Sequence, residues 1–126
     1  MRAVDANVLV RLIVRDHLTQ AASAEKFIEA GAWASTLAVA EASWVLTSVY
    51  KLTPKDLCGA IEMLLNHRDL ALQDPEAIAR ALDLCRAKPA LGFSDCLVLE
   101  LARKAGHLPL GTFDRNLASV EGAQKL

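Results

Sequence analysis

Four acidic residues stand where carboxylates can do chemistry. Asp5 ends a short apolar segment, Glu41 lies in the most apolar stretch of the chain, Asp95 follows a serine that can cap a helix, and Asp114 follows another short apolar segment. Carboxylates aimed at one place repel each other and stay ionised together only with compensating positive charge. No basic cluster is evident near them in the sequence, and hard oxygen ligands suit Mg²⁺ or Mn²⁺. Such ions activate water and neutralise a phosphodiester in the transition state, so the pattern points to metal-dependent phosphodiester cleavage.

Each acid also has a structural interpretation. Asp95 can complement a helix dipole, an effect of about 0.3–1 kcal/mol, and Asp114 in Thr-Phe-Asp-Arg-Asn can form a turn. Asp5 is harder to explain in this way, because Val4 and residues 8–10 make its surroundings apolar. Glu41 is the hardest, because its helical neighbours are apolar and a carboxylate buried among them needs a cation or hydrogen bonds.

Short strands alternate with helices along the chain. The expected strands are Arg2–Val4, Ala32–Ser35, Leu70–Leu72 and His107–Gly111. The expected helices are Asn7–Val14, Thr19–Ala30, Leu37–Tyr50, Thr53–Asn66, one that Asp74-Pro75 opens and that ends before Pro89, and Asp95–Ala105. Capping residues begin these helices, at Thr19, Ser35 or Thr36, Thr53, Asp74 and Ser94, and Gly31 and Gly106 end two of them. Residues 112–116 are expected to form a loop, and residues 120–126 carry weak signals.

This alternation predicts an α/β fold, a parallel sheet with helices on its faces. Ligands of such sheets bind at the carboxyl ends of the strands, which is where Asp5 and Asp114 stand. The helix over residues 37–50 is apolar nearly all round, so we expect it to be deeply buried or covered by another subunit.

Composition places the chain among compact intracellular proteins. Its 126 residues, 53% of them hydrophobic, predict a single domain over residues 1–126. A formal net charge of −1 does not by itself indicate a nucleic-acid binder. Three widely spaced cysteines suit reduced, core-filling thiols, and the three scattered histidines do not suit a zinc site. No signal peptide or membrane span is evident, so we expect a cytoplasmic protein.

Four segments together resemble the motifs of PIN-domain nucleases, particularly the VapC-like toxins of type II toxin–antitoxin systems. They are Val-Asp-Ala-Asn-Val-Leu-Val-Arg-Leu at 4–12, Leu-Ala-Val-Ala-Glu-Ala-Ser-Trp-Val-Leu at 37–46, Phe-Ser-Asp-Cys-Leu-Val-Leu-Glu-Leu-Ala-Arg-Lys-Ala-Gly at 93–106 and Leu-Gly-Thr-Phe-Asp-Arg-Asn-Leu at 110–117. Each motif alone is weak. The four occur in order and span most of the chain, which makes the resemblance fairly specific.

The resemblance implies a metal site and an activity. It assigns the catalytic and metal-binding roles to Asp5, Glu41, Asp95 and Asp114, with Asp5 and Asp95 central, and supporting roles to Asn7 and Thr112. One or two Mg²⁺ or Mn²⁺ ions would activate the attacking water, and cleavage of RNA would leave 5′-phosphate and 3′-hydroxyl ends. The implied fold is a PIN-like three-layer α/β/α sandwich around a small central parallel sheet.

The resemblance also implies partners. Its toxin branch forms homodimers, cleaves RNA and is inhibited by a cognate VapB-type antitoxin. The apolar helix over 37–50, together with Leu57, Ile61, Met63, Leu64 and Leu65, exceeds what one core face needs and predicts an interface. We expect the antitoxin to cover this region and to place an arginine near the carboxylates, in competition with the metal. Candidate phosphate contacts are Arg11, Arg15, Arg86, Lys88 and Arg115.

Three other functions stay open at this stage. A haloacid-dehalogenase-like phosphohydrolase also places an aspartate after its first strand, but its pattern needs a second aspartate where this chain has Asn7. A PIN fold can be a catalytically silent binding module, although all four acids are present here. A PIN nuclease can also process RNA outside any toxin–antitoxin pair.

Overall fold

The computed structural model describes all 126 residues as seven helices and five short strands. The strands are β1 (Arg2–Ala3), β2 (Ala32–Ala34), β3 (Leu70–Leu72), β4 (Leu110–Thr112) and β5 (Ala123–Lys125). The helices are α1 (Ala6–Ile13), α2 (Leu18–Ile28), α3 (Thr36–Ser48), α4 (Pro54–Asn66), α5 (Pro75–Ala87), α6 (Phe93–Ala105) and α7 (Arg115–Ala118). The expected α/β class is confirmed, and no helix is both long and apolar enough to span a membrane.

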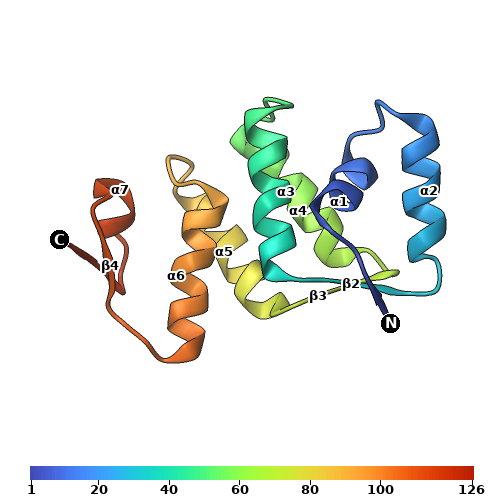
Figure 1. Ribbon diagram of the computed structural model, residues 1–126. Helices are drawn as coiled ribbons and strands as arrows, with labels where there is room; N and C mark the ends of the chain where they lie inside the picture. The colour runs from blue at the N-terminus through green and yellow to red at the C-terminus, as the bar shows by residue number, and fades with distance from the viewer.

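All strand pairs are parallel, as expected, but the strands form two sheets. One sheet has the order β1-β2-β3, and the other contains only β4 and β5. Figure 1 shows the β4–β5 pair at one end of the molecule, with α6 and α3 between it and the amino-terminal segment that contains β1, and α2 at the other end. The sequence did not predict this division, because strand alternation indicates parallel pairing without saying which strands are neighbours.

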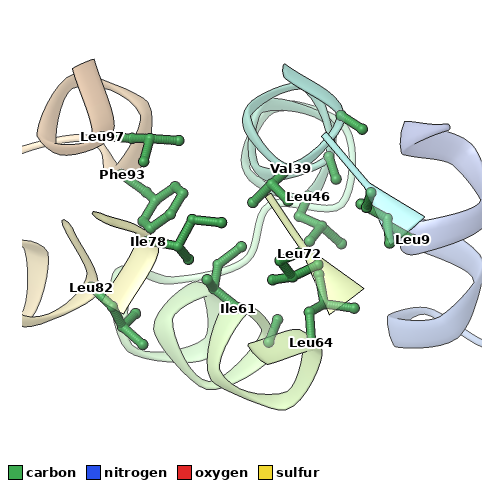
Figure 2. Packing of buried hydrophobic residues seen from close by; sticks show 14 of the residues in the cluster. Leu9, Val39, Leu46, Ile61, Leu64, Leu72, Ile78, Leu82, Phe93 and Leu97 are labelled. Atoms are coloured by element: carbon green, nitrogen blue, oxygen red, sulfur yellow. The ribbon is translucent and has the colours of Figure 1, made fainter. Parts of the chain in front are cut away.

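Helix α3 lies at the centre of the packing, in contact with α1, α4 and α6. It buries Val39 and Leu46 completely, and Figure 2 shows these side chains meeting Leu9 of α1 on one side and the α4 side chains on the other. Its opposite face exposes Leu37 and Trp44, which are 67% and 65% exposed. The expectation that this helix is deeply buried is therefore right for one face only.

The apolar residues of α4 serve the protein's own core. Leu57, Ile61 and Leu64 are buried, and Ile61 and Leu64 are fully enclosed, as Figure 2 shows. Met63 is exposed and Leu65 is half-buried. The prediction of an interface through all five residues is therefore wrong for the three buried ones, because α5 and β3 cover this face of α4 within the same chain.

Several helix starts differ from those predicted. His17 caps α2, its ring Nδ1 accepting from the Gln20 N–H, so the helix begins before Thr19. Helix α6 begins at Phe93, after Gly92, which places Ser94 inside the first turn. Thr53 caps α4 as predicted, by accepting from the Asp56 N–H.

The last third of the chain contains two elements that the sequence did not predict. Residues 115–118 form α7 instead of continuing a loop, and residues 123–125 form β5, which pairs with β4. The fourth strand covers Leu110–Thr112, so it begins three residues later than expected. Leu117 of α7 is buried in the main core, which attaches this unit to the helices.

The three cysteines are free and buried, which confirms their expected core-filling role. Burial raises the pKa of the Cys85 thiol to about 11 and that of Cys96 to about 12. Thiols of that kind stay protonated at neutral pH and are weak nucleophiles. The cysteines therefore contribute packing rather than chemistry.

The packing of α3 predicts a contrast between two leucines of that helix. Leu46→Ala, which empties a fully buried position, should lower the free energy of unfolding by about 2–5 kcal/mol. Leu37→Ala, on the exposed face, should change it by less than about 0.5 kcal/mol. Urea denaturation followed by circular dichroism measures both values, and equal losses would contradict the packing described here.

Candidate metal-binding site

Asp5 stands at the junction between β1 and α1. Its extended backbone ends the strand, and its Oδ1 accepts from the Val8 N–H at 3.2 Å, which caps α1. This bond satisfies one of the free N–H groups at the start of a helix. The side chain is exposed, and Oδ2 makes no hydrogen bond to the protein. One carboxylate oxygen therefore fixes the residue and the other is free for a ligand.

Glu41 lies in the middle of α3 and reaches solvent. Residues Ala38, Val39 and Ala42 beside it are buried, and this burial turns Glu41 toward the opposite face. The expectation that Glu41 emerges from an apolar face is correct, since Leu37, Trp44 and Val45 flank it. A buried position, which would itself have required a cation or hydrogen bonds, is wrong because no neighbouring helix covers this face of α3.

Asp5 and Glu41 line one solvent-open depression of about 340 Å³ between α1 and α3. We call it the acidic depression; its residues are Asp5, Ala6, Asn7, Glu41, Trp44 and Val45. Asn7, a predicted supporting residue, therefore lies with two of the four predicted acids. Asp5 and Asn7 also line a second depression between α1 and α2, of about 420 Å³. A larger cavity of about 600 Å³, lined by residues of α4 and α5, contains none of the four acids.

Asp95 and Asp114 do not line the acidic depression. Asp95 is exposed in the first turn of α6, where it complements the helix dipole. Asp114 caps α7, its Oδ1 accepting from the N–H groups of Asn116 and Leu117 at 2.8 and 3.1 Å. Thr112 supports this turn, because its Oγ1 accepts from the Asp114 N–H at 3.0 Å. No three acidic, histidine or cysteine side chains come close enough within one chain to hold a metal ion together.

The donor set of the acidic depression suits a hard divalent cation. Two carboxylates and one amide oxygen are the ligand types that Mg²⁺ and Mn²⁺ prefer, and Mg²⁺ commonly keeps several waters besides one or two carboxylates. Asp5, Glu41 and Asn7 therefore fit part of a coordination shell that leaves places for water and substrate.

The basic residues proposed for phosphate contact are mostly paired within the chain. Arg11 donates to Gln20, Asp16 and Tyr50, and the hydrogen bond with the Tyr50 hydroxyl raises the pKa of Arg11. Arg15 pairs with Glu25, and Arg86 pairs with Glu62. Lys88 donates to the Ser119 hydroxyl at 3.3 Å. These pairings leave Arg115, the first residue of α7, as the best remaining candidate.

One acid that the sequence reasoning passed over is buried. Glu100 of α6 is only 7% exposed, and Arg103 lies 3.3 Å from its carboxylate. The same arginine donates to the Glu121 backbone oxygen at 2.7 Å. This pair fastens α6 to the segment before β5, and the i, i+3 spacing of a glutamate and an arginine was the signal that could have identified it.

Metal titration tests the acidic depression. Asp5→Asn and Glu41→Gln should each weaken Mn²⁺ binding at least tenfold, because changes to outer-shell partners already cost roughly 10–100-fold. Asp56→Asn and Glu29→Gln, exposed acids away from the depression, are matched controls that should leave the affinity unchanged. Loss of the free-Mn²⁺ electron paramagnetic resonance signal gives the affinity, and equal effects of site and control variants would place the metal elsewhere.

Comparison of the sequence with models of protein families identifies one family, and the fold agrees with it. A family model described as PIN domain matches residues 2–123, almost the whole chain. No curated protein and no solved structure compared with the chain gave a match.

Proposed function

This chain belongs to the PIN-domain family, whose members are generally nucleases, and from that premise we propose that it is a Mg²⁺- or Mn²⁺-dependent endoribonuclease. The observation that carries the proposal is the meeting of Asp5, Asn7 and Glu41 in one solvent-open depression at the carboxyl end of β1. Carboxylates in this depression repel the phosphate backbone of RNA unless a cation lies between the two. A divalent cation and a phosphodiester are therefore the pair of ligands that this chemistry accommodates together.

The residues of the acidic depression would have separate roles in cleavage. A divalent ion, when bound, lowers the pKa of water and offsets the charge that develops on the phosphate. Asp5, fixed through Oδ1 by the Val8 N–H, would hold the cation through Oδ2, and Glu41 and Asn7 would each supply a further oxygen. One of the carboxylates accepts the proton of the attacking water. Attack in line forms the new P–O bond as the bond to the 3′ oxygen breaks, and the departing 3′ oxygen takes a proton from solvent water, which leaves a 5′-phosphate and a 3′-hydroxyl.

We propose further that the nuclease is the toxin of a toxin–antitoxin pair, acting in the cytoplasm. The resemblance of its four motifs to VapC-like toxins supports this role. The exposed Leu37 and Trp44 beside Glu41 support a VapB-type antitoxin that covers this face of α3. An arginine of the antitoxin close to Asp5 and Glu41 would replace the positive charge of the metal, so inhibitor and metal would compete.

Cleavage of labelled RNA tests the enzymatic proposal. The wild-type protein should cut single-stranded RNA with Mg²⁺ or Mn²⁺ and not in chelator, and Asp5→Asn should lower the rate about 100-fold or more. Asparagine is itself a good helix cap, so Asp5→Asn should keep the melting temperature of the wild type. Asp56→Asn is the matched control with full activity.

Three outcomes would contradict parts of this proposal. Wild-type protein that binds RNA without cutting it would favour the catalytically silent binding module. Full activity of Asp5→Asn would remove Asp5 from the mechanism, and a large fall in its melting temperature would assign Asp5 a structural role. Growth arrest on expression, relieved by a small protein encoded next to it, separates a toxin from an RNA-processing nuclease.

A further inference from the structure

Strands β1 and β4 are both edge strands, and each has one side that pairs with no other strand. We propose that β1 of one copy pairs with β4 of a second copy. The resulting dimer would contain composite sites, each with Asp5 and Glu41 from one copy and Asp114 from the other. The role of these composite sites rests on the nuclease function proposed above; the pairing of the strands does not.

The free edge of β1 presents Ala3. Strand β1 pairs only with β2, and the Val4 N–H donates to the Trp33 oxygen at 2.9 Å. In a parallel strand, the backbone groups of successive residues point to opposite neighbours, so those of Ala3 point away from β2. Ala3 is exposed. Its N–H and C=O are therefore unpaired and accessible to another strand.

The free edge of β4 presents Gly111 in the same way. The Leu110 N–H donates to the Gly122 oxygen at 2.8 Å, and the Thr112 oxygen accepts from the Leu126 N–H at 2.9 Å. Both residues therefore direct their backbone groups toward the β5 side. Gly111, between them, directs its N–H and C=O to the opposite side, and it is exposed.

The chain does not bring its own two edges together. The β4–α7–β5 unit is attached to the helices by the buried Leu117, by the bond from Arg103 to the Glu121 oxygen and by that from Lys88 to Ser119. Figure 1 shows this unit at one end of the molecule, with α6 and α3 between it and the amino-terminal segment that contains β1. Pairing within one chain would break these contacts, whereas a second copy supplies both edges with the helices in place.

Exposed apolar side chains flank both edges. Met1, directly before β1, is 83% exposed; Phe113, directly after β4, is 78% exposed; and Leu126, directly after β5, is 63% exposed. Parallel sheets are normally covered on both faces, so large apolar side chains are seldom exposed to solvent beside them as they are here. A strand pair between two copies would place these side chains beside the new junction.

The proposed pairing has a consequence for the acids. If Ala3 lies opposite Thr112, then Asp5 lies opposite Asp114, because each acid follows two residues later in its strand direction. Parallel pairing places the carboxyl ends of both strands at one edge of the sheet. Each copy offers one β1 and one β4, so in a symmetric dimer both edges of both copies are paired, and each sheet has the order β3-β2-β1-β4-β5 with the last two strands from the partner.

Complementation between variants tests the composite site. Asp5→Asn and Asp114→Asn, each of which should be inactive alone, are co-expressed with different tags, and the mixed dimer is purified on both. One of its two sites then combines the intact Asp5 of one copy with the intact Asp114 of the other, so about half of wild-type RNA cleavage should return. A mixed dimer as inactive as the single variants would overturn the composite site. Inactive wild-type protein in the same assay would instead overturn the proposed function.

The strand pairing has a test that needs no activity. Light scattering at micromolar concentration should give a dimer for the wild type and for Ala3→Ser, which keeps the outward N–H. Ala3→Pro lacks that N–H without touching the bond from Val4 to Trp33, and it should dissociate at concentrations where the wild type is dimeric. Phe113→Ser, at a position 78% exposed, should also weaken the dimer while keeping the wild-type circular dichroism spectrum. A monomeric wild type, or folded Ala3→Pro and Phe113→Ser proteins that dimerise like the wild type, would overturn the pairing.

Discussion

The burial of one face of α3 is the constraint on which the rest of the structure depends. This helix contacts α1, α4 and α6 at once, and Val39, Ala42 and Leu46 are completely enclosed among them. A helix fixed in this way has no rotational freedom, so its other face is determined as well. Glu41 is therefore held close to the start of α1, where Asp5 caps that helix. The acidic depression is thus a result of hydrophobic packing, and its carboxylates reach solvent because the core turns them outward.

Local signals in the sequence were enough to predict most of the fold. Capping residues, glycine stops and apolar periodicity gave the six longer helices and the first three strands with boundaries close to those observed. Asp74 shows where such signals fail. It begins α5 as predicted, but its backbone is left-handed (φ 48°) instead of extended and its side chain makes no cap bond; its Oδ1 accepts from Lys104 of α6 at 2.6 Å. The side chain thus makes a tertiary ion pair in place of the local cap bond, and no local pattern reveals this.

The candidate site was predictable in part for the same reason. Asp5 and Asn7 follow the first strand directly, and Glu41 is the only acid of the apolar helix, so their types and positions marked them. Whether a carboxylate is buried depends on what covers it, which periodicity does not show. Glu41 proved exposed, and Glu100 proved to be a buried acid held by Arg103. The separation of Asp114 from the depression follows from the division of the strands into two sheets, which is a property of the whole topology.

The central claim is that Asp5 and Glu41 together bind a divalent cation. Crystals of the protein grown with Mn²⁺, and measured at a wavelength where manganese scatters anomalously, would locate the ion directly. The account predicts an anomalous peak in the acidic depression, within coordination distance of carboxylate oxygens of both Asp5 and Glu41. A peak held by other residues, with this depression filled by water alone, would contradict it.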